Sequence, residues 1–147
     1  MIFTIGHSNH SLDKFIGLLT SHDIDVLVDV RSNPVSRFSP HFNKRALEDA
    51  VKASGMKYVF LGKELGGRPQ ASEFYDQGGG VMYDRLAESG LFLEGVDRLM
   101  EGSKKYRVAL MCGEEDPAKC HRRLLVGREL ARRGVPTQHI RGDGTIE

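Results

Sequence analysis

The sequence predicts a single α/β domain over residues 1–147: a Rossmann-like three-layer sandwich with a mostly parallel sheet of about five strands and helices on both faces. The length fits one domain. Short apolar segments alternate with segments of helical periodicity, as strands and crossover helices do in parallel sheets. Residues 24–30 are apolar without alternation, which is typical of a strand covered on both faces.

Two strands and one helix are expected in the first part of the chain. Residues 1–6 are short, β-branched and aromatic, which favours a strand, and residues 24–30 form the next one. Ser11 is expected to cap the helix between them. Pro34 and Pro40 then prevent either type of element from continuing. The apolar residues of the helix have helical spacing: Leu12, Phe15, Ile16 and Leu19.

The middle of the chain is expected to hold a helix, a strand and a long loop. Asn43 is placed to cap the helix, which ends at Gly55, and residues 57–62 form the third strand. Residues 63–81 are rich in glycine and long for a connection. Such a segment is expected to be a lid, a binding loop or partly disordered.

Two helices and two strands complete the predicted order. Residues 83–102 are mostly helical with an interruption near Gly90, and residues 106–112 form the fourth strand. Residues 120–134 form the last helix and residues 136–140 a short final strand. This alternation favours a parallel sheet.

Each expected strand leads into residues that can take part in chemistry. In an open parallel sheet, ligands bind outside the carboxyl ends of the strands. The sequence therefore predicts a functional site at this edge of the sheet. In chain order, the residues there are His7 and Ser8, Asp29 and Arg31, Lys63 and Glu64, Cys112 and Glu114, and His139 and Arg141.

Asp29 and Arg31 are expected to form an ion pair, because residues two apart on a strand point to the same face. The pair either presents the guanidinium to a phosphate or carboxylate, or only fixes the following loop, which also holds Arg37. Gly66 and Gly67 are interpreted as a flexible turn first and a phosphate cradle second. No dinucleotide-binding or P-loop motif occurs, and no cofactor is expected.

Residues 111–123 hold both cysteines and three consecutive carboxylates. Cys120 lies near the start of a helix beside His121 and Arg122, a position expected to lower the pKa of its thiol. Backbone N–H groups at the same helix start can meet a phosphate. Glu114, two residues past the strand, is placed to act as a general base, an acid or a nucleophile.

Two other interpretations of this segment are open. A zinc site would use Cys112, Cys120 and His121, with His7 as a further ligand, but the spacing matches no common zinc motif and no metal is expected. The cysteines can also be small buried hydrophobes. With two cysteines and no export signal at the N-terminus, both are expected to be reduced thiols in the cytoplasm.

The overall charge gives little information about partners. A net charge of +1 causes no general attraction to nucleic acid or membrane. Residues 120–141 nonetheless hold six arginines against one acid, Glu129, which fits either an anionic small molecule or nucleic acid, or a solvated helix face. The apolar runs are too short to cross a bilayer, so no membrane partner is expected. The oligomeric state is not indicated.

Several motifs resemble those of a known family, in the same order and over nearly the whole chain. They are Thr4-Ile5-Gly6-His7-Ser8, Asp29-Val30-Arg31, Pro34, Ser36-Arg37, Phe42, Tyr58, Leu65-Gly66-Gly67, Cys112, Glu114 and Cys120-His121-Arg122. On these motifs the sequence is identified as a member of the family called domain of unknown function 488. The resemblance implies an α/β fold and no particular activity.

A partial resemblance to rhodanese-like domains lies in Asp29-Val30-Arg31 after a strand and in Cys112 at the end of a later strand. It implies that Cys112 would carry a persulfide. The loop that follows departs from that pattern, because Glu114, Glu115 and Asp116 are expected to repel a thiolate and any oxyanion.

Three functions follow from these observations. The favoured one is an enzyme for a nucleotide or nucleic-acid-like substrate, with Glu114 as acid, base or nucleophile and His7 assisting. An alternative is sulfur transfer or thiol redox chemistry through Cys112 or Cys120. Another is a module that binds an anion or nucleic acid without catalysis. The residues expected to bind the anionic group are Ser8, Asp29, Arg31, Ser36, Arg37, Gly66, Gly67, His121 and Arg122.

Overall fold

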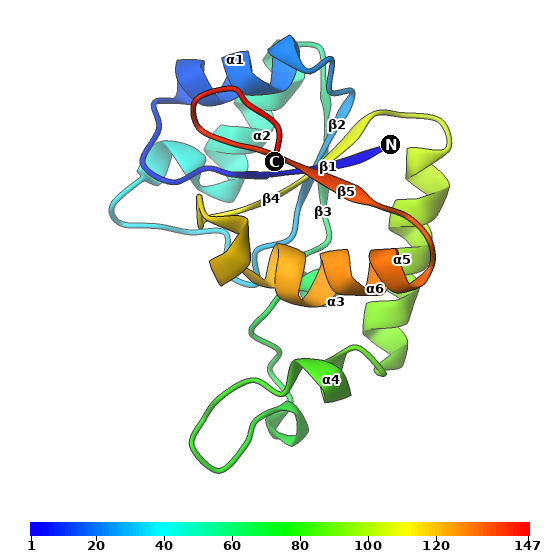
Figure 1. The fold of residues 1–147 in the computed structure, drawn as a ribbon. Coiled ribbons are helices and arrows are strands. Elements are labelled where there is room, and N and C mark those ends of the chain that lie inside the picture. The colour runs from blue at the N-terminus through cyan, green and yellow to red at the C-terminus, as the bar shows by residue number, and fades with distance from the viewer.

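The structure is a computed structural model that describes residues 1–147, apart from the side chain of Arg123. Over these residues, five parallel strands form one sheet in the order β3-β2-β4-β1-β5 (Figure 1). The predicted fold class is confirmed. The strands are β1 (Ile2–Gly6), β2 (Val26–Asp29), β3 (Lys57–Phe60), β4 (Val108–Cys112) and β5 (Thr137–Ile140).

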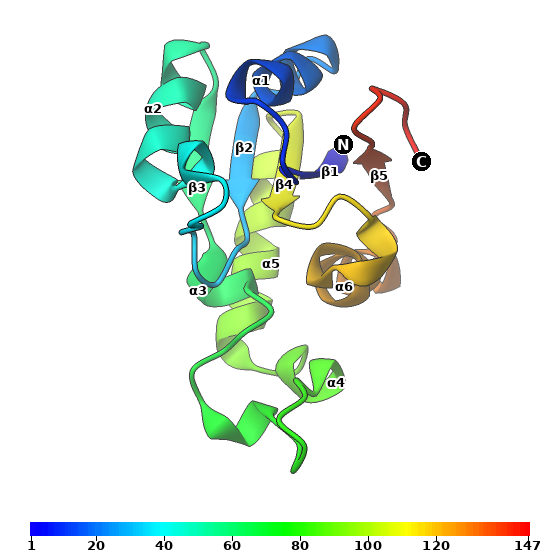
Figure 2. The same cartoon turned by 90° about the vertical axis from the view of Figure 1, so that its left-hand side faces the viewer.

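Helices cover both faces of the sheet (Figures 1 and 2). On one face, α1 (Leu12–Ser21) and α2 (Lys44–Ala53) share an apolar core with Phe3 and Ile5 of β1. On the other face, α5 (Gly90–Ser103) and α6 (Arg128–Arg132) share a core with Ile2. The two cores separate in this way because successive strand residues point to opposite faces.

The capping residues of the first helices differ in what they do. Ser11 caps α1 as predicted, and its hydroxyl accepts a hydrogen bond from the Lys14 N–H at 3.2 Å. Asn43 occupies the N-cap position of α2 without capping it through its side chain. Its Oδ1 instead accepts from the Ser36 N–H at 2.7 Å. The amide therefore stabilises the loop between β2 and α2 rather than the helix.

The glycine-rich segment 63–81 contains short elements that the sequence did not predict. They are α3 (Gly62–Leu65), a 3-10 turn at Ser72–Phe74 and an isolated bridge between Tyr75 and Val81. Together with α4 (Tyr83–Leu86), the segment projects away from the sheet (Figures 1 and 2). The break predicted near Gly90 is confirmed, because α4 and α5 are separate helices. Within the described part of the chain, no helix is long and apolar enough to span a membrane.

The last helical segment is irregular. Residues Arg122–Gly127 form a π-helix, η4, and only Arg128–Arg132 continue as the α-helix α6. The sequence predicted one regular helix over 120–134. A π-helix has a wider turn than an α-helix, and such turns are frequent at functional sites.

Candidate functional site

Three neighbouring strands bring the candidate residues together. Beyond the strand ends, the His7 N–H donates to the Cys112 carbonyl at 2.9 Å, and the Val30 N–H donates to the Met111 carbonyl at 3.0 Å. These bonds hold the loops after β1, β2 and β4 side by side. A cavity of about 500 Å³ lies at this edge. The predicted site residues that line it are His7, Arg31, Ser36, Gly67, Cys112, Glu114, Cys120 and His121.

Arg31 is held rigidly at the wall of this cavity. Its Nε and Nη2 donate to the two carboxylate oxygens of Asp29, at 2.9 and 2.8 Å. Tyr58 donates its hydroxyl to the same carboxylate at 2.6 Å. Burial, reinforced by this bond, raises the pKa of the Tyr58 hydroxyl, which therefore stays a donor. The predicted ion pair between Asp29 and Arg31 is therefore present. Asp29 is fully buried and Arg31 is 7% exposed, so only part of the guanidinium reaches the cavity.

His7 presents a neutral imidazole at the same wall. Its ring stacks on Phe42, with centroids 4.5 Å apart, and Nδ1 lies 2.8 Å from the Ser8 carbonyl, so Nδ1 carries the proton and donates. Burial lowers the pKa of the imidazole. Its Nε2 is therefore a free acceptor among the described residues. A Cβ at Gly113 would lie 3.4 Å from this nitrogen, in ordinary van der Waals contact.

Cys112 and Cys120 form a pair at the cavity wall. They are joined by a disulfide, and their Cα atoms are 7.5 Å apart. The expectation of two reduced thiols was wrong for this structure, because the acidic segment folds back and sets the helix start against the strand end. Both cysteines belong to the apolar core on the α5 side, as the buried-hydrophobe interpretation expected, yet both also line the cavity.

Arg122 lies behind the sulfur pair and not in the cavity. The side chain is fully buried, and burial lowers its pKa to about 10. Nη1 donates to the sulfur of Cys112 at 2.8 Å and to the carbonyl of Glu114. Nε donates to the Thr4 hydroxyl at 3.2 Å, and Nη2 donates to the Glu115 carbonyl at 2.9 Å. Among the described residues, no carboxylate oxygen bonds to this cation.

His121 is placed beside the second sulfur. Its Nε2 donates to the Val30 carbonyl at 2.8 Å, which leaves Nδ1 unprotonated and 3.7 Å from the sulfur of Cys120. Burial lowers the pKa of this imidazole too. Gly67 packs against the ring, where a Cβ would lie 2.8 Å from Cγ of His121. Gly67 therefore gives room to the histidine.

The three carboxylates of the acidic segment lie apart from the sulfur pair, with one exception. Glu115 binds Arg141 at 2.7 Å and the Gly142 N–H at 2.7 Å, and Asp116 accepts from the Ala118 N–H at 3.0 Å. Only Glu114 lines the cavity, exposed, with Oε1 accepting from the Asp116 N–H at 3.1 Å. Of the three carboxylates that were expected to repel a thiolate or an oxyanion, only that of Glu114 therefore lies in the cavity.

Several predicted residues do not line the cavity. Asp29 and Arg122 lie buried behind its wall, and Arg37 is exposed, with its guanidinium 5.9 Å from the ring centre of Phe38. Gly66 packs tightly, since a Cβ there would lie 2.2 Å from the Ser32 hydroxyl. The hydroxyl of Ser8 donates to the side chain of Asn9 at 3.4 Å, its one partner among the described residues.

Other polar groups at the strand ends also point elsewhere. Glu64 lies 3.6 Å from Arg98 of α5, and Arg141 pairs with Glu115 and Glu147. His139 is buried and contacts the Thr4 hydroxyl.

Seven residues of the cavity wall were not among the predicted site residues: Ser32, Asn33, Val35, Arg68, Tyr83, Gly113 and Lys119. Arg68 follows the double glycine and Lys119 precedes Cys120, so their positions next to motif residues were an available signal. Within the part of the chain that the structure describes, no three His, Cys, Asp or Glu side chains gather as metal ligands.

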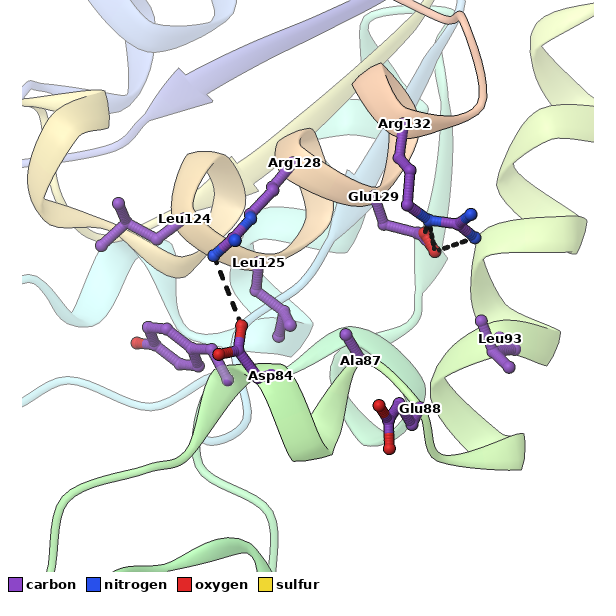
Figure 3. A pocket seen from close by; sticks show the side chains of 10 residues that line it. Asp84, Ala87, Glu88, Leu93, Leu124, Leu125, Arg128, Glu129 and Arg132 are labelled. Carbon is purple, nitrogen blue, oxygen red and sulfur yellow. Dashed lines mark hydrogen bonds and ion pairs between the residues drawn. The ribbon is translucent and has the colours of Figure 1, made fainter.

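A larger cavity of about 970 Å³ lies between α4 and the η4–α6 segment (Figure 3). Four of its five charged lining side chains form two pairs, Arg128 with Asp84 at 3.4 Å and Arg132 with Glu129 at 2.7 Å (Figure 3). Both arginine side chains are largely exposed. This part of the arginine-rich segment is a solvated helix face.

The fold and the site together define an α/β protein with a parallel sheet and a polar, partly buried site at its carboxyl edge. The family model described as domain of unknown function DUF488 matches residues 11–128, and the chain belongs to this family. No curated protein and no solved structure matches the chain significantly.

Proposed function

We propose that the protein is an enzyme that acts on a phosphate-bearing substrate, of the nucleotide or nucleic-acid-like class, in the cavity at the carboxyl edge of the sheet. The observation that carries the proposal is the fixed guanidinium of Arg31, held by Asp29 and Tyr58 against this cavity. Nη1 of Arg31 has no hydrogen-bond partner among the described residues and can donate to a phosphate oxygen.

The charges around the cavity support an anionic substrate. Arg31, Arg68 and Lys119 line it, against Glu114 as the carboxylate among its described lining residues. The volume of about 500 Å³ is within the range of small-molecule sites. Arg37 and Arg122 were expected to bind phosphate but do not line the cavity. In this proposal Arg68 and Lys119, which do line it, take that role.

Acid–base chemistry is assigned to two side chains of the cavity wall. The neutral imidazole of His7 has a free Nε2 that can accept a proton, because Nδ1 is bound to the Ser8 carbonyl. The exposed side chain of Glu114 lines the cavity, where its carboxylate can act as a base or as a nucleophile.

The test is turnover of a panel of nucleotides and simple phosphate esters by the purified protein and its Glu114→Gln variant. The amide keeps the size of the side chain but cannot transfer a proton, so turnover should fall by about 100-fold or more. Binding should be retained, since Arg31 is untouched. Glu94→Gln, on the exposed face of α5, is the matched control.

Unchanged turnover in Glu114→Gln would rule out the role of this carboxylate. Salt-sensitive binding of the panel without turnover by the parent protein would instead support a module that binds anions without catalysis.

A further inference from the structure

The contacts of Arg122 show that the cysteine pair is more than apolar packing. A fully buried guanidinium is costly unless an anion accompanies it. Its bonding partners are the Thr4 hydroxyl, two backbone carbonyls and the sulfur of Cys112. Of these groups, only the sulfur can carry a negative charge. When the disulfide is reduced, the thiolate of Cys112 is therefore a counter-ion in direct contact with this buried cation, in addition to the more distant carboxylates of Glu114 and Glu115.

The second sulfur has a different neighbour. Cys120 lies 3.7 Å from the unprotonated Nδ1 of His121, whose ring is oriented by its bond to the Val30 carbonyl. This nitrogen can take the proton of the Cys120 thiol. One sulfur of the pair is thus stabilised as an anion and the other has a base, and both line the cavity.

We propose that Cys112 and Cys120 form a thiol–disulfide couple that exchanges with a low-molecular-weight disulfide bearing carboxylates, bound in the same cavity. The class of disulfide follows from the cations Arg31, Arg68 and Lys119 at the cavity wall. This activity is separate from the phosphate chemistry proposed above and does not depend on it.

The exchange takes two steps. The Cys112 thiolate attacks one sulfur of the bound disulfide, the bond between its two sulfurs breaks, and the first half leaves as a thiolate that takes a proton from water. Cys120 then passes its proton to His121 and attacks the sulfur of Cys112. The mixed disulfide breaks, and the second half leaves with the proton from His121. Two electrons pass from the cysteines to the small disulfide.

The test uses the reduced full-length protein in mixtures of reduced and oxidised glutathione. After an acid quench, remaining thiols are labelled with a maleimide and counted by intact mass. Both thiols should disappear together without retained glutathione. Cys120→Ser should trap one glutathione on Cys112, whereas Cys112→Ser should react at least about tenfold more slowly, because a thiol without a cation is mostly protonated at neutral pH.

Arg122 has its own readout in the same experiment. In the Cys120→Ser background, the absorbance of the Cys112 thiolate at 240 nm should titrate at a lower pH than that of free cysteine. Arg122→Met should raise the pH of this titration. Arg122→Lys should lower it again in part, because lysine keeps the positive charge. If the Arg122 variants fail to fold, the two serine variants decide the outcome. Equal and slow reaction of both single cysteines, or a disulfide only between two chains, would overturn the proposal.

Discussion

Asp29 is the side chain that holds the guanidinium of Arg31. Its two oxygens accept from Arg31, from the Tyr58 hydroxyl and from the Arg31 N–H at 3.1 Å. Because it is fully buried, its charge is compensated only by these groups. Asp29 is thus a positioning residue, and Arg31 is the group that would meet the substrate.

We predict that Asp29→Asn destabilises the protein by about 3–5 kcal/mol, because it leaves the buried guanidinium without its anion. Tyr58→Phe removes one hydrogen bond to the same carboxylate and should cost about 1–2 kcal/mol. Urea unfolding of both variants measures the difference. A larger loss in Tyr58→Phe than in Asp29→Asn would contradict the assigned roles.

At the scale of elements, two glycines differ in whether their surroundings leave room for a side chain. Gly67 follows the turn after α3 and contacts the ring of His121 at the start of the last helical segment. Gly17 lies in the middle of α1, on an exposed face, with nothing within 4 Å of a built Cβ. The same residue type is therefore required at one position and unfavourable at the other.

We predict opposite effects of alanine at these two glycines. Gly67→Ala forces the His121 ring to move and should destabilise the fold by about 1–3 kcal/mol. Gly17→Ala should stabilise it by about 0.5–1 kcal/mol, because alanine has the higher helix propensity. Thermal or urea unfolding gives both values, and stabilisation by Gly67→Ala would show that the ring is not confined as described.

At the scale of the whole molecule, buried histidines connect the site to the pH dependence of stability. Burial lowers the pKa of His7 and of His121 below the ordinary value near 6.5. The unfolded chain therefore binds more protons as the pH falls through that value. Their contribution to stability is fully present above about pH 6.5 and is lost as the pH falls below it.

We predict that the free energy of unfolding is constant from pH 8 to 7 and decreases from pH 7 toward pH 6. His121→Gln keeps an N–H donor near the position of Nε2 for the Val30 carbonyl but does not titrate. Its decrease should therefore be smaller, with His7 and His10 causing the remainder. Urea denaturation at each pH measures this. Equal decreases in both proteins would exclude His121 as a source of the effect.

Much of the fold was predictable from local pattern. The ends of each predicted strand lie within two residues of those of an observed strand, and the break near Gly90 is present. The π-helix at Arg122–Gly127 and the short elements within 63–81 were not predictable, because they depend on contacts with distant segments and leave no periodic signal.

The candidate site was predicted in composition and only partly in arrangement. The sequence by itself determined that His7, Arg31, Glu114 and the cysteines gather at one edge, because parallel strands end at the same edge and the chain alternates strand with helix. Only the tertiary structure decided that Arg122 faces a sulfur instead of a substrate. Where a long, flexible side chain finds its partner depends on which groups packing buries beside it, and spacing along the chain does not contain that information.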